Sequence, residues 1–239
     1  MYELQGLSDA FFLMLYGAAA WFALLAAVYL LFGRGNAVAG DEVVPNTLLR
    51  RWTATFMMAV FMSHVWWAVP EASDDRLVRN IVCIALDRLT FVPLMMCVLL
   101  RILQDRRRSL WPVWAAVAPV AVLAVVCLAL RSDVFEPAVE WYMAVVAVGF
   151  LVYYVRAVRQ YGHWLLDNYA DLERKEVWQS LLLLALILFV HVAYSTNGGA
   201  LVTEYLAQVN TMVIIAFLLW RVETLQELEA EEDENNENL

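Results

Sequence analysis

Seven apolar stretches follow one another along this chain of 239 residues. A helix needs about 20 predominantly apolar residues to cross the hydrocarbon core of a membrane. The composition agrees, because 63% of the residues are hydrophobic and 17% are charged, against roughly 45–50% and about 25% in soluble domains. We therefore expect an all-α membrane protein, a seven-transmembrane helix bundle. Its spans are predicted at about 10–32, 52–70, 80–100, 111–130, 139–158, 177–195 and 201–220.

The formal net charge of -9 is concentrated at the C-terminus. Eight acidic residues and no basic residue follow Arg221, whereas the rest of the chain is close to neutral. Runs of like charge usually form solvated tails or linkers. We therefore divide the chain into a membrane domain at 1–221 and an acidic cytoplasmic tail or linker at 222–239. An acidic total also argues against nucleic-acid binding by this chain itself.

The basic residues predict the orientation of the bundle, because cytoplasmic loops carry an excess of Lys and Arg. Three arginines fall on one side of the predicted spans: Arg76, Arg79 and Arg131. Twelve basic residues fall on the other side: Arg34, Arg50, Arg51, Arg101, Arg106, Arg107, Arg108, Arg156, Arg159, Arg174, Lys175 and Arg221. The sequence therefore predicts an outside N-terminus and a cytoplasmic C-terminus.

Polar residues within the spans gather at one predicted depth. Ionisable side chains in a membrane span are costly and mark function by default. At about 1.5 Å rise per residue, those of four spans lie within roughly 10 Å of the outer boundary, and the inner halves are expected to be almost purely apolar. The candidate ligand-binding residues are His64, Trp67, Asp87, Arg88, His191, Tyr194, Glu204 and Gln208. A structural network that fixes helix register is the alternative interpretation.

Asp87 and Arg88 are adjacent, so they point about 100° apart on a helix and each needs a partner on another helix. Glu204 is a candidate partner for Arg88, and His64 or His191 is a candidate partner for Asp87. Glu204 and Gln208 are four residues apart and share one helix face. That face is expected to line the interior of the bundle.

Three cofactor hypotheses were considered for this layer. His64, Asp87 and His191 offer two imidazoles and a carboxylate for a metal, and two histidines at matched depth suit haem. Retinal needs a lysine amine inside the bundle, but the only lysine, Lys175, falls in a predicted loop. We expect no cofactor, no catalytic residue and no metal, and we keep the three-residue metal site as the alternative.

The last span continues as a helix into the acidic tail. A short apolar stripe follows its end, and a rigid helix of this kind can transmit movement. The candidate relay residues are Trp220, Arg221, Val222, Leu225 and Leu228. A second segment, at 161–178, has near-helical apolar spacing and predicts either an amphipathic helix or an extension of the fifth span.

Two segments resemble a known family. DNYADLERKEVWQS and WRVETLQEL are similar to parts of the polytopic N-terminal sensor modules of Bacteroides/Prevotella-type membrane-bound regulators. In these regulators an acidic linker and a cytoplasmic AraC-type helix-turn-helix domain follow the multi-span sensor. The resemblance covers about the last third of the chain, and this sequence contains no DNA-binding domain. It implies a multi-pass protein of the bacterial inner membrane.

The expected function is that of a sensory receptor module. It would detect a small ligand or a membrane state in the outer half of the bundle. It would relay the signal through the last helix to a cytoplasmic output domain. The expected partners are membrane lipid, a small ligand, an output domain such as a fused helix-turn-helix, and a second copy in a homodimer. The alternatives are a metal-dependent membrane hydrolase, a haem-binding membrane protein, and a structural anchor for the output domain.

Overall fold

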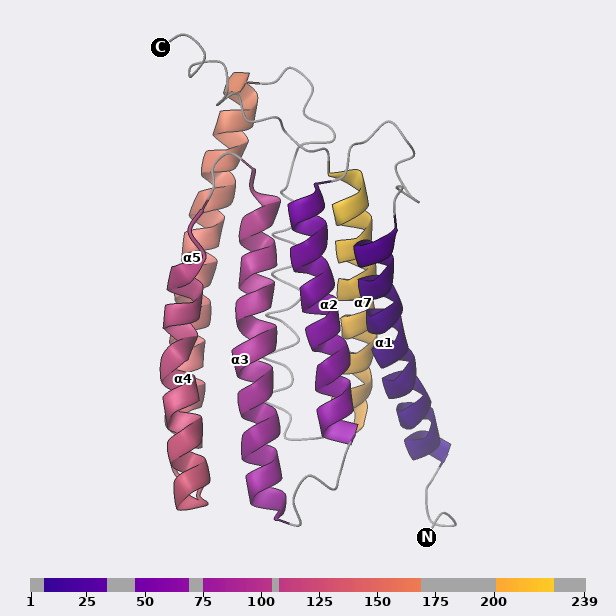
Figure 1. Cartoon of the computed structure of the whole chain (residues 1–239), viewed down its shortest axis with the longest axis vertical. Helices are drawn as coiled ribbons and strands as arrows, with labels where there is room; N and C mark the ends of the chain where they lie inside the picture. Colours follow the sequence, from indigo (N-terminus) through magenta and orange to yellow (C-terminus); the bar gives the residue numbers. More distant parts are fainter. Residues whose placement is uncertain (1–6, 34–45, 69–74, 105–107, 169–200, 226–239) are drawn as a thin grey trace.

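The computed structural model describes residues 7–33, 46–68, 75–104, 108–168 and 201–225. Every regular element in these ranges is a helix. They are α1 (Leu7–Phe32), α2 (Thr47–Ala68), α3 (Arg76–Ile102), α4 (Trp111–Leu130), α5 (Glu136–Asn168) and α7 (Leu201–Thr224). The helices stand side by side along the long axis of the molecule (Figure 1). The all-α prediction is confirmed for these ranges, and the sixth predicted span, at 177–195, lies outside them.

Five helices are long and apolar enough to cross a membrane, namely α1, α3, α4, α5 and α7. They leave large apolar side chains on the outer surface, including Trp21, Leu25, Val125, Trp141 and Val148. Soluble monomers rarely expose contiguous apolar surface on this scale. The fold is that of a membrane-embedded helical bundle. We call the end at which α1, α3, α5 and α7 finish the inner end, and the opposite end the outer end.

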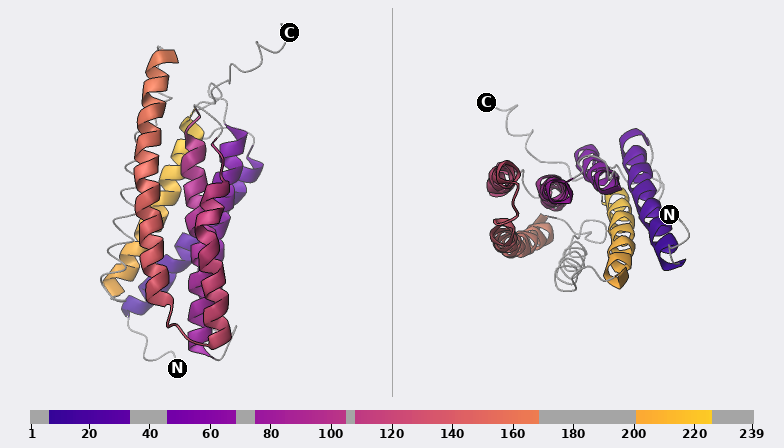
Figure 2. Two further views of the ribbon diagram at one scale, coloured as in Figure 1. Left: turned by 90° about the vertical axis from the view of Figure 1, so that its left-hand side faces the viewer. Right: turned by 90° about the horizontal axis from the view of Figure 1, so that it is seen from below.

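The second predicted span needs correction. We expected it at 52–70, but α2 runs from Thr47 to Ala68, and it is not among the five helices of membrane-spanning hydropathy. It packs against α1, α3 and α7, and it lies between α1 and α3 when the bundle is seen from below (Figure 2). These contacts bury one face of α2. Of the two arginines that we assigned to a loop, Arg50 lies on the buried face and Arg51 on the exposed face.

Local sequence signals explain where several helices begin and end. The side chain of Asn46 accepts a hydrogen bond from the backbone N–H of Leu49, and Asp75 does the same for Leu77. Both side chains satisfy donors that a helix start leaves open. At the end of α4, Arg131 has a left-handed backbone with φ 47. That conformation ends the helix and turns the chain toward α5 within a few residues.

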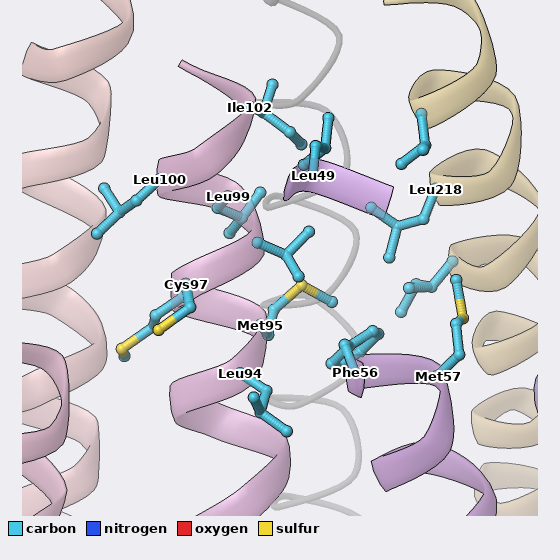
Figure 3. Close-up of a cluster of buried hydrophobic side chains, with 14 of the residues drawn as sticks. Leu49, Phe56, Met57, Leu94, Met95, Cys97, Leu99, Leu100, Ile102 and Leu218 are labelled. Carbon is cyan, nitrogen blue, oxygen red and sulfur yellow. The ribbon is translucent and has the colours of Figure 1, made fainter. Parts of the chain in front are cut away.

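The core is densest around the inner half of α3. Eight consecutive residues, Pro93 to Leu100, are buried. A helix that is apolar and buried on every side occupies the centre of a bundle. Leu99 and Ile102 of α3 lie in one apolar cluster with Phe56 of α2 and Leu218 of α7 (Figure 3).

The fifth helix is longer than predicted. We expected the span to end near 158, but α5 continues to Asn168. Tyr161 and Leu165 in this extension are fully or almost fully buried. The first part of the 161–178 segment is therefore an extension of the fifth helix. The remainder lies outside the described residues.

Small residues allow α1 to approach its neighbours closely. Ala19, Ala23, Ala26 and Ala27 are buried, and α1 packs against α2 and α7. Substituting leucine for Ala27 would place a larger, branched side chain in the closely packed interface between α1 and its neighbours. We expect A27L to lower the free energy of unfolding by about 1–3 kcal/mol, measured by denaturant titration in detergent.

The matched control is A10L, which makes the same change at an exposed position of α1. We expect A10L to unfold within about 0.5 kcal/mol of the native chain. Equal stability of the two variants would contradict the close packing of α1.

Candidate functional site

The outer end of the bundle holds a carboxylate bound by three donors from one helix. Asp87 of α3 accepts hydrogen bonds from Ser63 Oγ at 2.7 Å and Trp66 Nε1 at 3.1 Å on Oδ1, and from Trp67 Nε1 at 2.7 Å on Oδ2. The donors occupy positions i, i+3 and i+4 of α2, which lie on one helix face. Asp87 therefore ties the outer end of α2 to α3. We call these four residues the carboxylate cage.

A second contact between α3 and the end of α2 lies beside the carboxylate cage. The last carbonyl groups of a helix have no partner within the helix. Cys83, one turn before Asp87 on α3, donates its thiol to the carbonyl oxygen of Trp66 at 3.5 Å. Helix α3 continues past this point at the outer end (Figure 1). Trp67, the penultimate residue of α2, keeps 41% of its surface exposed.

Arg88 points to a different helix from Asp87. Its Nη2 lies 2.7 Å from Oε1 of Glu136 and 3.9 Å from Oε1 of Glu140, both in the first turns of α5. The prediction that Arg88 pairs with Glu204 was wrong. Because neighbouring helix positions diverge by about 100°, one α3 position contacts α2 and the next contacts α5. Glu136 lies outside the predicted fifth span of 139–158, so it was not among the predicted partners.

His64 forms a second cluster and does not contact Asp87. Its Nδ1 lies 2.8 Å from the carbonyl oxygen of Val60, and its Nε2 lies 2.9 Å from Oε1 of Gln208. A carbonyl can only accept, so Nδ1 carries a proton. On the other side of the ring, Nε2 is hydrogen-bonded to the side-chain amide of Gln208.

Tyr16 of α1 completes this cluster. Its hydroxyl donates to the carbonyl oxygen of His64 at 2.8 Å, and the two rings lie 4.6 Å apart. We call Tyr16, His64 and Gln208 the outer triad, because each comes from a different helix: α1, α2 and α7. Tyr16 was not predictable from the sequence, since a tyrosine in an apolar span resembles a core residue.

The other predicted site residues divide into two groups. Glu204 is half-buried, one turn before Gln208 on α7, and has no hydrogen bond or ion pair within the described ranges. His191 and Tyr194 lie outside the described residues. The alternative metal site needs His64 beside Asp87, but their polar atoms have separate partners. Within the part of the chain that the structure covers, no group of three or more His, Cys, Asp or Glu residues is placed to hold a metal.

The inner end holds a buried ion pair that we did not predict. Arg50 Nη2 of α2 lies 3.9 Å from Glu223 Oε1 of α7, and the side chains are only 7% and 2% exposed. The hydroxyl of Tyr29 on α1 donates to the same Glu223 oxygen at 2.9 Å. We call Tyr29, Arg50 and Glu223 the inner triad. Arg50 and Glu223 lie just outside the predicted spans of 52–70 and 201–220, so the expectation of almost purely apolar inner halves does not cover them. Glu223 had been assigned to the solvated tail at 222–239, but it is a buried partner.

Gly33 allows the inner triad to form. Arg50 Nη2 donates to the carbonyl oxygen of Gly33 at 3.0 Å. A Cβ atom at position 33 would lie 2.6 Å from the backbone oxygen of Tyr29 and 3.3 Å from Arg50 Nη2. Because a backbone atom blocks it, any side chain here would displace the end of α1 or the arginine.

The predicted relay residues lie at the inner end of α7. Arg221, Val222 and Leu225 are buried, Trp220 is exposed, and Leu228 lies outside the described residues. Helix α7 ends at Thr224. The described start of the relay therefore packs against the bundle beside the inner triad.

Comparison with protein-family models, with curated proteins and with solved structures finds no match for this chain.

The buried ion pair generates a prediction about stability. Removing one partner of a buried pair leaves an uncompensated charge, at a cost of about 3–5 kcal/mol. We expect R50M and E223L each to lose free energy of unfolding on that scale. The double variant R50M/E223L should lose less than the sum of the two, because neither charge remains. Chemical denaturation in detergent measures all three.

The control is R51M, because Arg51 is adjacent and exposed. We expect its stability to lie within about 0.5 kcal/mol of the native chain. Strictly additive losses in the double variant would show that the two charges do not interact.

Proposed function

We propose that this chain is a sensory module of the bacterial inner membrane, with seven spans, an outside N-terminus and a cytoplasmic C-terminus. The five apolar helices support membrane embedding. The distribution of basic residues supports the orientation, with Arg101, Arg108 and Arg221 at the inner end and Arg76, Arg79 and Arg131 at the outer end.

One observation carries the proposal: α1, α2 and α7 each contribute one residue to the outer triad and one to the inner triad. They are Tyr16 and Tyr29, His64 and Arg50, and Gln208 and Glu223. Within each helix, the outer and the inner residue are about 20 Å apart at 1.5 Å per residue. Polar contacts therefore fix the same three helices at both ends, with apolar side chains such as Ile215 and Leu218 between them.

This arrangement suits transmission along the bundle. A ligand shifts an equilibrium only if it binds two arrangements with different affinity. Binding at the outer end that alters the His64–Gln208 contact would turn or shift α7. Glu223 would then move relative to Arg50 at the inner end of α7.

The output is proposed to lie in the cytoplasm. The resemblance to AraC-type membrane regulators points to a fused helix-turn-helix domain beyond the acidic segment. Membrane lipid, a small ligand and a second copy of the chain are the other proposed partners. The transcriptional role rests on that resemblance, whereas the relay rests on the two triads.

The experiment that tests the relay measures the inner end while the outer end is changed. Spin labels at W220C and S109C, both exposed positions at the inner end, report the distance from α7 to the start of α4. We expect Q208L to shift or broaden this distance distribution by a few ångströms. The control V209A alters an exposed position of α7 and should leave the distribution unchanged. Identical distributions in all three proteins would contradict the relay.

The orientation has its own test. Asp133 and Ser109 are exposed at opposite ends of the bundle, whereas the native cysteines are buried. In intact cells a membrane-impermeant maleimide should label D133C. It should label S109C only after the membrane is permeabilised. The native chain is the control for background labelling, and the reverse pattern would overturn the proposed orientation.

A further inference from the structure

Among the described residues, the carboxylate cage holds a negative charge without a counter-ion. Asp87 takes part in none of the ion pairs of the described residues, and its three donors are neutral. The adjacent cation, Arg88, is held by Glu136 and Glu140. Asp87 is half-buried, and pairing stabilises a charge that is partly withdrawn from water. A cation from outside the described residues would compensate this charge.

The hydrogen bonds of Asp87 define where such a cation would bind. An ionised carboxylate offers about four acceptor positions. Two on Oδ1 are filled by Ser63 and Trp66, and one on Oδ2 is filled by Trp67. The acceptor position that no described donor fills is therefore on Oδ2, the oxygen bound by the exposed Trp67.

The number of acceptor positions left on Asp87 also indicates which kind of cation fits. A guanidinium binds a carboxylate best through two parallel hydrogen bonds, but Oδ1 has no position left. A quaternary ammonium has no N–H to donate, and a metal ion requires several oxygen ligands. A primary ammonium needs one acceptor, and its charge is attracted to the face of an indole ring.

We propose that Asp87 and Trp67 form a binding site for a primary ammonium group. The group donates one N–H to Oδ2 of Asp87 and lies against the indole of Trp67. It belongs either to a free amine or to the headgroup of an aminolipid. This inference identifies the ligand class of the proposed sensor, and so it rests on the proposed function.

Binding is tested with the full chain in nanodiscs that lack amine headgroups. Propylammonium is the probe, and the melting temperature at increasing concentration gives the apparent affinity. We expect propylammonium to stabilise the native chain. Propanol, propionate and tetramethylammonium should not stabilise it. Equal stabilisation by tetramethylammonium would overturn the hydrogen-bonded site.

Variants connect the effect to these residues. D87N should weaken the apparent affinity for propylammonium at least tenfold. D133N, which neutralises an exposed carboxylate at the same end, should change it less than twofold. W67L gives a second measure if D87N folds poorly, and it should weaken the affinity severalfold through loss of the indole face. Unchanged affinity in both D87N and W67L would overturn the proposal.

Varying the lipid of the nanodisc identifies the source of the ammonium group. If phosphatidylethanolamine in the nanodisc weakens propylammonium binding by competition and phosphatidylcholine does not, the headgroup occupies the site. If neither lipid changes the affinity, the ligand is a free amine. Both results support the ammonium site. A failure to bind leaves the relay intact, because the spin-label distances test the relay without any ligand.

Discussion

The packing of the inner end depends on compensating one buried arginine. Arg50 cannot reach bulk water from its place among α1, α2 and α7, so a carboxylate must remain beside it. Because Glu223 also accepts from Tyr29, the register of all three helices is fixed by a single side chain of α7. The apolar contacts between the inner and the outer triad would tolerate small sliding movements of the helices. The ion pair limits larger shifts, since a movement of one helical turn would leave two charges unpaired.

The five long apolar helices were predictable from sequence because long apolar stretches have few alternatives in lipid. The layer of polar residues near the outer end was also recognised, and it does contain His64, Asp87 and Gln208. The pairing was not predictable, since the depth of a residue says nothing about the helix it faces. Arg88 illustrates this: its partner Glu136 is found only when α5 is placed beside α3. Glu223 was hidden for another reason, because it opens an acidic run and was grouped with it.

Helix α3 connects two parts of the bundle. Asp87 joins it to α2, and Arg88 joins it to α5. Two adjacent residues therefore contact two different neighbouring helices, and any rotation of α3 would affect both contacts at once. The carboxylate cage is consequently sensitive to the position of α5 as well as to what binds at Trp67.

The inner triad also has a consequence for biosynthesis. Glu223 follows Tyr29 by 194 residues, and at a translation rate of 5–20 residues per second it emerges roughly 10–40 s later. During that interval α1 and α2 have been synthesised, and Arg50 can already donate to the carbonyl oxygen of Gly33 but has no access to Glu223. The charge of Arg50 therefore stays without its carboxylate until α7 has been made. The inner triad is thus completed by α7.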